Sequence, residues 1–334
     1  MKMNGSRLSI CRRELMNPEV RAHFLLFIIF LWRALPSHVC SSRPRSRKAT
    51  TYLLVRIPNG HQYYMTDPKR PRRQRRQSII ILRHGVAVHN VPDPRTKQYP
   101  DLFDPLVTDP PLIPQGTQQA SQIALKIRQF LAAIGRTDVD LVICSPLRRC
   151  LQTASLAFPP QQKTSISAVA TTTTSPVVPA EPSDPGNRRP RILVNELVRE
   201  ACGLHYPDKR RDRSHIAAEF PWVQLPEDFA AVDPYWRPDA RETLPQLKGR
   251  IVAFFQWLAS NVQEELVGIV SHGVWIESCL MHFCPAVLEN GKKRVYNCDA
   301  FKAICVSTWE QGNDNEWNLV SVGLEECELV GQAT

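Results

Sequence analysis

Four short polar motifs constrain the fold of this chain, because each one follows a short apolar run. The motifs are Leu82-Arg83-His84-Gly85, Ser145-Pro146-Leu147-Arg148-Arg149, Glu200 with Gly203, and Ser271-His272-Gly273. The preceding runs, residues 79–82, 141–144, 192–194 and 267–270, have the length and composition of buried β-strands. Open α/β sheets bind ligands beyond the carboxyl ends of their strands. The sequence therefore predicts that the four motifs meet at one edge of a sheet.

Helical periodicity between the apolar runs completes an α/β pattern. Apolar residues recur at helical spacing over residues 115–134, with Pro114 suited to the first turn and Gly135 to the end. Further elements are expected in four places: helices at 147–157, at 247–259 and after Gly273, and a closing β-hairpin formed by 301–308 and 317–322. The predicted fold is a three-layer α/β/α sandwich with a mostly parallel sheet of about six strands.

The globular domain is expected to begin near Ser78, where a basic, proline-broken stretch gives way to a β-rich run. Residues 1–77 are predicted to be a largely disordered leader, and residues 78–334 a single catalytic domain. Within that domain, residues 159–190 lack the apolar surface that would offset their ordering entropy, so they are predicted to be a disordered insertion. Residues 204–242 show no regular periodicity over a long stretch, which is typical of a cap or lid.

Most of the positive charge lies in the leader. Residues 1–77 carry 17 Lys and Arg against 3 Asp and Glu, so the chain's net charge of +10 leaves about −4 for the rest. Residues 69–76 are a basic run for which the sequence allows an anionic partner, such as nucleic acid, anionic lipid or an import receptor. A solvated, disordered tail is the simpler interpretation, because runs of like charge repel and rarely fold.

Cysteine usage indicates a reducing compartment. The ten cysteines form no dense disulfide framework and no Cys-x-x-Cys pair, and Cys144, Cys150 and Cys279 fall inside apolar patterns typical of buried free thiols. These features favour the cytoplasm or the nucleus. A secretory or organellar leader stays open as an alternative, since the apolar stretch 24–32 is too short to span a bilayer but has the character of a signal-peptide core.

The residue types in the motifs match those that phosphomonoester hydrolysis requires. His84 is the candidate nucleophile, since a neutral imidazole nitrogen can attack phosphorus and form a covalent intermediate. Arg83 and Arg149 are candidate phosphate ligands, because guanidinium groups donate bidentately to phosphate oxygens. His272 would add a donor from another strand end, and Asn90 either donates to a phosphate oxygen or holds the loop.

Two further residues have expected roles in the same chemistry. Glu200 is the candidate proton donor for the departing alkoxide, and later the base that activates water. Gly85 is expected to leave room for the phosphate to approach the backbone. Together with the histidines and arginines, these residues supply a nucleophile, oxyanion donors and an acid.

The chain resembles the histidine phosphatase superfamily, also called the phosphoglycerate mutase-like family, from residue 78 to about 322. The matching segments are Leu82-Arg83-His84-Gly85 with Asn90, Asp109-Pro110-Pro111-Leu112 with Gly116, the segment 145–154, Glu200, and Val270-Ser271-His272-Gly273. The resemblance implies a phosphohistidine at His84, a phosphate site of Arg83, Arg149 and His272, and Glu200 as general acid.

Within that resemblance, two residues have close competitors. Arg149 is preferred to Arg148, because the family's arginine lies four residues after the serine. Glu200 is preferred to Glu196, because it begins the Glu-x-x-Gly pattern. Residues 205–213, with Lys209 and Arg210 as phosphate or substrate ligands, resemble a substrate wall, and a solvated loop is the alternative.

The sequence thus predicts a metal-independent phosphatase that needs no cofactor and acts on a small phosphorylated metabolite. A mutase is the second hypothesis, because a mutase and a phosphatase share this pocket. The phosphatase is preferred, since Ala201-Cys202 stands where the resemblance implies charged and aromatic residues in the mutase branch. A non-catalytic phosphate-binding protein is the third, although binding alone needs no nucleophile. No specific protein partner is predicted.

Overall fold

The computed structural model describes residues 55–56, 62–63, 70–158, 190–289 and 294–332. The apolar stretch 24–32 and nearly all of the predicted insertion 159–190 lie outside the described residues. Short strands β1 (Val55–Arg56) and β2 (Gln62–Tyr63) pair with each other antiparallel. No helix in the described part of the chain is long and apolar enough to cross a membrane.

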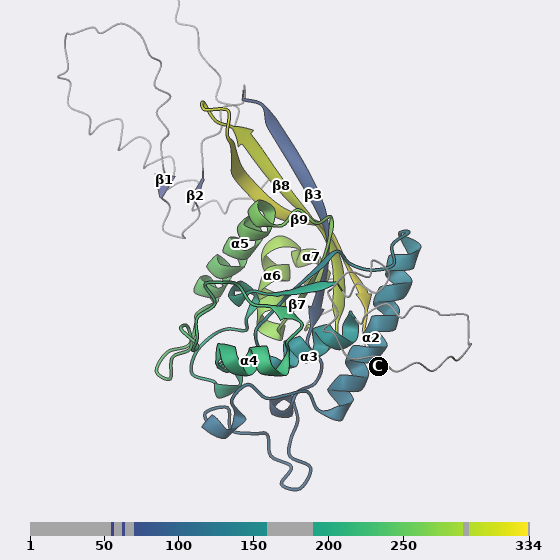
Figure 1. The fold of residues 1–334 in the computed structure, drawn as a ribbon, viewed down its shortest axis with the longest axis vertical. Coiled ribbons are helices and arrows are strands. Elements are labelled where there is room, and N and C mark those ends of the chain that lie inside the picture. The colour runs from purple at the N-terminus through teal and green to yellow at the C-terminus, as the bar shows by residue number, and fades with distance from the viewer. Residues whose placement is uncertain (1–54, 57–61, 64–69, 159–189, 290–293, 333–334) are drawn as a thin grey trace, which may run out of the picture. The chain divides into compact units, whose positions relative to one another are not determined.

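A seven-stranded mixed sheet forms the centre of the domain, in the order β6-β5-β4-β7-β3-β8-β9. Figure 1 labels its strands β7, β3, β8 and β9. Its strands are β3 (Arg72–Arg83), β4 (Leu141–Cys144), β5 (Arg191–Val194), β6 (Val223–Gln224), β7 (Leu266–Ser271), β8 (Ala300–Gln311) and β9 (Trp317–Gly331). The five strands from β6 to β3 run parallel, and β8 and β9 add antiparallel pairs at one side. The α/β prediction with a mostly parallel sheet is confirmed.

Helices connect these strands close to the predicted positions. They are α2 (Pro114–Ala133), α3 (Arg148–Ala157), α4 (Arg213–Glu219), α5 (Leu244–Asn261), α6 (Gly273–Phe283) and α7 (Pro285–Glu289). Four short 3-10 helices are η1 (Val88–Asn90), η2 (Pro105–Val107), η3 (Glu196–Val198) and η4 (Tyr206–Asp208). The cysteines predicted to be buried thiols, Cys144, Cys150 and Cys279, are free and buried.

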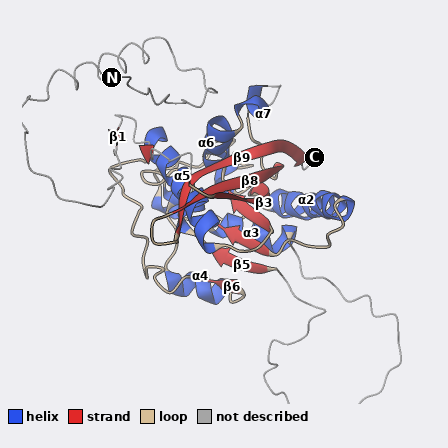
Figure 2. Cartoon of the chain, turned by 90° about the horizontal axis from the view of Figure 1, so that it is seen from above, coloured by secondary structure: helices blue, strands red, loops and turns tan. Residues whose placement is uncertain are grey.

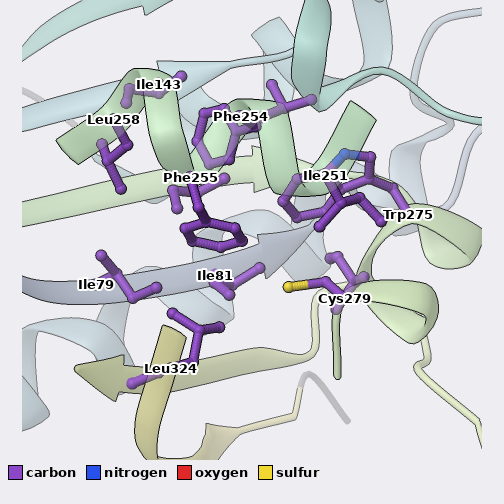
Figure 3. Close-up of a cluster of buried hydrophobic side chains, with 14 of the residues drawn as sticks. Ile79, Ile81, Ile143, Ile251, Phe254, Phe255, Leu258, Trp275, Cys279 and Leu324 are labelled. Carbon is purple, nitrogen blue, oxygen red and sulfur yellow. The ribbon is translucent and has the colours of Figure 1, made fainter. Parts of the chain in front are cut away.

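Alternation along the central strand β3 divides the core into two layers. Successive side chains of a strand point to opposite faces, so Ile79 and Ile81 pack with α5 and α6, whereas Ile80 and Leu82 pack with α2 and α3. Figure 3 shows the first layer, in which Phe254 lies among the buried side chains. Replacing such a ring by alanine costs about 3–5 kcal/mol. Figure 2 shows the same strands and helices from above.

The basic run corrects the predicted start of the domain. Strand β3 begins at Arg72, six residues before Ser78, and its arginine-rich half pairs with β8 over its whole length. Arg72 forms an ion pair with Glu310, and Arg76 forms two, with Glu325 and Glu326. Acidic residues distant in the sequence therefore neutralise a run of like charge that by itself indicates a disordered tail.

The stretch 204–242 is more regular than the predicted lid. It contains helix α4, whose Ile216 is fully buried, and strand β6, which adds a parallel edge strand to the sheet. A two-residue strand has no apolar run to mark it, so the sequence pattern gives no sign of it. We keep the name lid for residues 204–242.

Candidate active site

The carboxyl ends of β3 and β7, and the turn after β4, bring the predicted motifs together. His84 follows β3 directly, and its backbone N–H donates to the Ser271 carbonyl at the end of β7. The His84 and His272 rings lie 5.1 Å apart between centroids. Arg149, in the first turn of α3, places Nε 3.2 Å from His84 Nε2 and Nη2 3.1 Å from His272 Nδ1. All three side chains are at most 2% exposed.

Hydrogen bonds select one tautomer of His84. Its Nδ1 lies 2.7 Å from the Gly85 carbonyl oxygen, which can only accept, so Nδ1 carries the proton. Nε2 faces the Arg149 guanidinium, which can only donate. Burial, and then the positive charge of Arg149, lowers the pKa of His84 well below its usual range. The ring is therefore neutral, with an unprotonated Nε2.

Arg149 rather than Arg148 reaches the two histidines. Besides its contacts with them, Arg149 donates from Nη1 to the Pro207 carbonyl at 2.6 Å and pairs with Asp208 at 2.9 Å. Arg148 turns to Glu219, with Nε 2.7 Å from Oε1. Consecutive residues of a helix project about 100° apart, and only one of the two therefore faces the strand ends.

Arg83 adds a second guanidinium with an unused donor. Its Nη1 donates to the Val295 carbonyl at 2.5 Å, and its buried Nε has no hydrogen-bond partner among the residues that the structure describes. A Cβ at Gly273 would lie 3.1 Å from Arg83 Cζ, so the glycine makes room for this side chain. A buried donor without a partner is costly, and a bound anion would satisfy it.

The Glu200 carboxylate lies at the N-terminus of α6, the helix that begins directly after His272. It accepts from the backbone N–H groups of Ala201, Val274 and Trp275 at 2.9–3.2 Å. Burial, and then the negative charge of Asp208, raises the pKa of Glu200, while these hydrogen bonds oppose the shift. A carboxyl group with a raised pKa is suited to act as a proton donor near neutral pH.

Comparison with known proteins identifies this arrangement. The sequence model of the histidine phosphatase superfamily (branch 1) matches residues 79–167 and 209–322. The chain belongs to the histidine phosphatase superfamily. It is similar to an Arabidopsis thaliana "phosphoglycerate mutase-like protein", at 30% identity over 72% of this chain and 88% of that protein.

The chain is also similar to two further proteins. A "probable phosphoglycerate mutase" of Arthroderma benhamiae is 27% identical over 60% of this chain and 56% of its own length. A solved phosphoserine phosphatase from Entamoeba histolytica matches 75% of this chain and 98% of its own, at 16% identity and a TM-score of 0.35.

We call Arg83, His84, Arg149, Glu200 and His272 the strand-end cluster. The acid that competed with Glu200 for the proton-donor role, Glu196, does not join it. Glu196 pairs instead with Arg199 and Arg210, at 3.1 and 2.7 Å. These three residues and Asp233, which pairs with Arg199 at 2.7 Å, form the lid anchor.

Three of the predicted ligands contact other protein groups in the structure. Asn90 holds the loop, since its Oδ1 accepts from the Ala87 backbone N–H at 3.0 Å. Lys209 places its ammonium over the Trp236 ring, 4.7 Å from the centroid. The Arg210 side chain donates to Glu196 and to the carbonyls of 211, 230 and 232, so its donors are engaged within the lid and its predicted role as a phosphate ligand stays a prediction. These partners cannot be seen from a local basic pattern.

Gly85 also has a different function from the predicted one. A Cβ at this position would lie 2.4 Å from the Gly116 carbonyl oxygen, so the glycine permits close packing of its loop on α2. Its backbone N–H donates to Thr153 Oγ1 at 3.0 Å. Asn297 fixes the same loop by donating from Nδ2 to the His84 carbonyl at 3.0 Å. The backbone of His84 and Gly85 is therefore held from both α3 and the segment before β8.

The sequence patterns indicate no role for His89, and they place Asp208 only within the predicted substrate wall of residues 205–213. The His89 ring lies 6.2 Å from that of His84, and its Nδ1 is buried without a partner. Burial, with the charges of Arg149 and Arg83, lowers its pKa to about 2. The only signal for His89 was its position next to Asn90. Asp208 lies inside the basic segment 205–213, whose pattern is dominated by lysine and arginine.

Proposed function

We propose that this chain is a metal-independent phosphatase that hydrolyses a small phosphorylated metabolite through a phosphohistidine at His84. The observation that carries the proposal is the neutral His84 ring, with Nδ1 bound to a carbonyl and Nε2 facing a guanidinium. A histidine held only for structure has no need of an unprotonated nitrogen beside two arginines. Such a nitrogen is a nucleophile for phosphorus.

The first step transfers the phosphoryl group to the protein. The Nε2 lone pair forms a bond to phosphorus, and the bond from phosphorus to the ester oxygen breaks. Glu200 gives its proton to that oxygen, which leaves as an alcohol. Arg83 and Arg149 donate hydrogen bonds to the phosphoryl oxygens, whose charge shifts in the transition state, and His272 supports Arg149 through its Nδ1 contact.

The second step returns the protein to its starting state. Glu200, now a carboxylate, accepts a proton from water as the water oxygen attacks phosphorus. The bond between phosphorus and Nε2 breaks, inorganic phosphate leaves, and His84 recovers its lone pair. Glu200 again carries the proton that it lost in the first step.

The decisive experiment measures phosphate release from para-nitrophenyl phosphate by the full chain, in EDTA, at mildly acidic pH. His84→Ala is expected to remove the activity, because it takes away the nitrogen that attacks phosphorus in the proposed first step. His215→Ala, which changes an exposed histidine of α4, is the matched control and is expected to retain it. Full activity in His84→Ala would overturn the histidine mechanism.

Mutase activity is the second candidate, favoured by the names of the Arabidopsis and Arthroderma relatives. The two reactions share the first step and differ in whether water or an acceptor hydroxyl receives the phosphoryl group. Incubation with 3-phosphoglycerate, followed by 31P NMR, separates them. Formation of the 2-phospho isomer favours the mutase, and release of inorganic phosphate favours the phosphatase.

A further inference from the structure

A lid carboxylate is in direct contact with the guanidinium that would hold the phosphoryl group. Asp208, in η4, is 5% exposed, and its Oδ1 lies 2.9 Å from Arg149 Nη2. Its other oxygen, Oδ2, lies 3.1 Å from Arg241 Nη1, so the carboxylate is shared by two cations. The Asp208 carbonyl accepts from Arg199 Nη2 at 2.8 Å, which ties η4 to the lid anchor.

Every group of the Arg149 guanidinium is already engaged. Nε donates to His84, Nη1 to the Pro207 carbonyl, and Nη2 to Asp208 and His272. A phosphoryl group at His84 that binds this guanidinium must share or replace these contacts. Among these contacts, only the one with Asp208 is made by an anion, so only there would the phosphoryl group compete with another negative charge for Arg149.

We propose that Asp208 is a positioning residue that competes with the phosphoryl group for Arg149, so that phosphate is held less tightly and is released after each turnover. This inference rests on the proposed function, since it assigns the bound anion to the strand-end cluster. Asp208 keeps Arg149 in place before substrate arrives. Its negative charge then weakens the binding of product phosphate by repulsion at close range.

The charge of Asp208 also acts on the proton donor. Its proximity contributes to the raised pKa of Glu200, second only to burial. Several charged or titratable groups face this pair of acids: Arg83, Arg149, Arg241, Cys150, Cys202 and His205. Removing the charge of Asp208 is therefore expected to lower the pKa of Glu200, so that the proton donor is lost at a lower pH.

Asp208→Asn tests the competition, because the amide keeps an oxygen for Arg149 and loses the charge. Isothermal titration of the full chain with inorganic phosphate is expected to give a dissociation constant about tenfold lower than in the unmodified chain. Asp239→Asn is the matched control. Asp239 is also a lid carboxylate paired with an arginine, but it is exposed, and phosphate affinity is expected to stay the same.

Arg241→Gln provides a test of opposite sign. Without Arg241, the Asp208 carboxylate has Arg149 as its remaining ion-pair partner, so phosphate is expected to bind more weakly. General damage to the lid would weaken binding in both variants. Tighter binding in Asp208→Asn together with weaker binding in Arg241→Gln therefore separates competition from a merely structural role.

The binding assay needs no turnover, so the two proposals fail separately. Unchanged or weaker phosphate binding in a folded Asp208→Asn overturns the competition and leaves the phosphatase standing. Tighter binding without any phosphatase activity supports the competition and counts against the proposed function. If the unmodified chain binds no phosphate, both proposals are overturned.

Discussion

Arg83 in the strand-end cluster and Arg210 in the lid anchor are both largely buried arginines, yet their surroundings differ. Arg210 donates to Glu196 and to three backbone carbonyls, so its charge and its donors are satisfied within the protein. Arg83 donates to one carbonyl and keeps a buried Nε without a partner. The partners already present, rather than the residue type, distinguish an arginine whose donors are satisfied from one that keeps a buried donor for a ligand to use.

Replacing each arginine by methionine tests this difference most directly. Arg210→Met is expected to lower the free energy of unfolding by about 3–5 kcal/mol, because it leaves Glu196 short of a buried partner. Arg83→Met is expected to lower kcat/KM about a hundredfold or more, with a much smaller change in unfolding, since the anion loses a donor. Denaturant unfolding and steady-state kinetics measure the two effects. Equal losses of stability would break the comparison.

Adjacent arginines on α3 sharpen the same contrast. Arg149→Lys is expected to reduce kcat/KM about a hundredfold, because a single ammonium cannot reproduce the fork of donors that reaches His84 and His272. Arg148→Lys, whose parent side chain pairs with Glu219, serves as the control and should behave like the unmodified chain. A comparable loss in both variants would show that helix stability, not phosphate contact, explains the first result.

The pH dependence of kcat/KM is expected to be the smallest of these effects, and it concerns only the strand-end cluster. In the proposed mechanism His84 attacks as a neutral ring and Glu200 donates a proton. The lowered pKa of His84 keeps the ring neutral below pH 6.5, so activity is expected to persist at mildly acidic pH. Glu200 must be protonated in the first step, so kcat/KM is expected to fall as pH rises through its raised pKa. Glu200→Gln should abolish that alkaline limb. A profile that instead falls below pH 6.5 would contradict the neutral histidine.

Local patterns in the sequence were sufficient to predict the parallel strands and the residues that follow their carboxyl ends. Strand β4 spans 141–144 as predicted, and His84, Arg149 and His272 meet because the ends of neighbouring parallel strands lie at one edge. The apolar runs identify the strands, and the polar residues after them identify the site. Neither inference needs knowledge of distant contacts.

The parts that sequence reasoning missed depend on partners outside the local pattern. The first half of β3 looks like a solvated basic tail until Glu310 and Glu325 are placed beside it. Arg210 resembles a phosphate ligand until Glu196 and the lid carbonyls surround it. The sequence indicates that Gly85 leaves room for a ligand, whereas in the structure the Gly116 backbone lies where a Cβ of residue 85 would be. Packing of this kind follows from the whole fold.

The pairing of β3 has a consequence for how the chain is made. On the ribosome, β3 emerges long before either of its neighbours, since Arg72 and Glu310 are 238 residues apart. Its apolar half, Ile79–Leu82, must wait for β7 and β8, and unpaired strands of this kind are prone to aggregate. Nascent chains arrested before β8 should therefore require chaperones and lack catalytic competence, which would arise only near the end of translation.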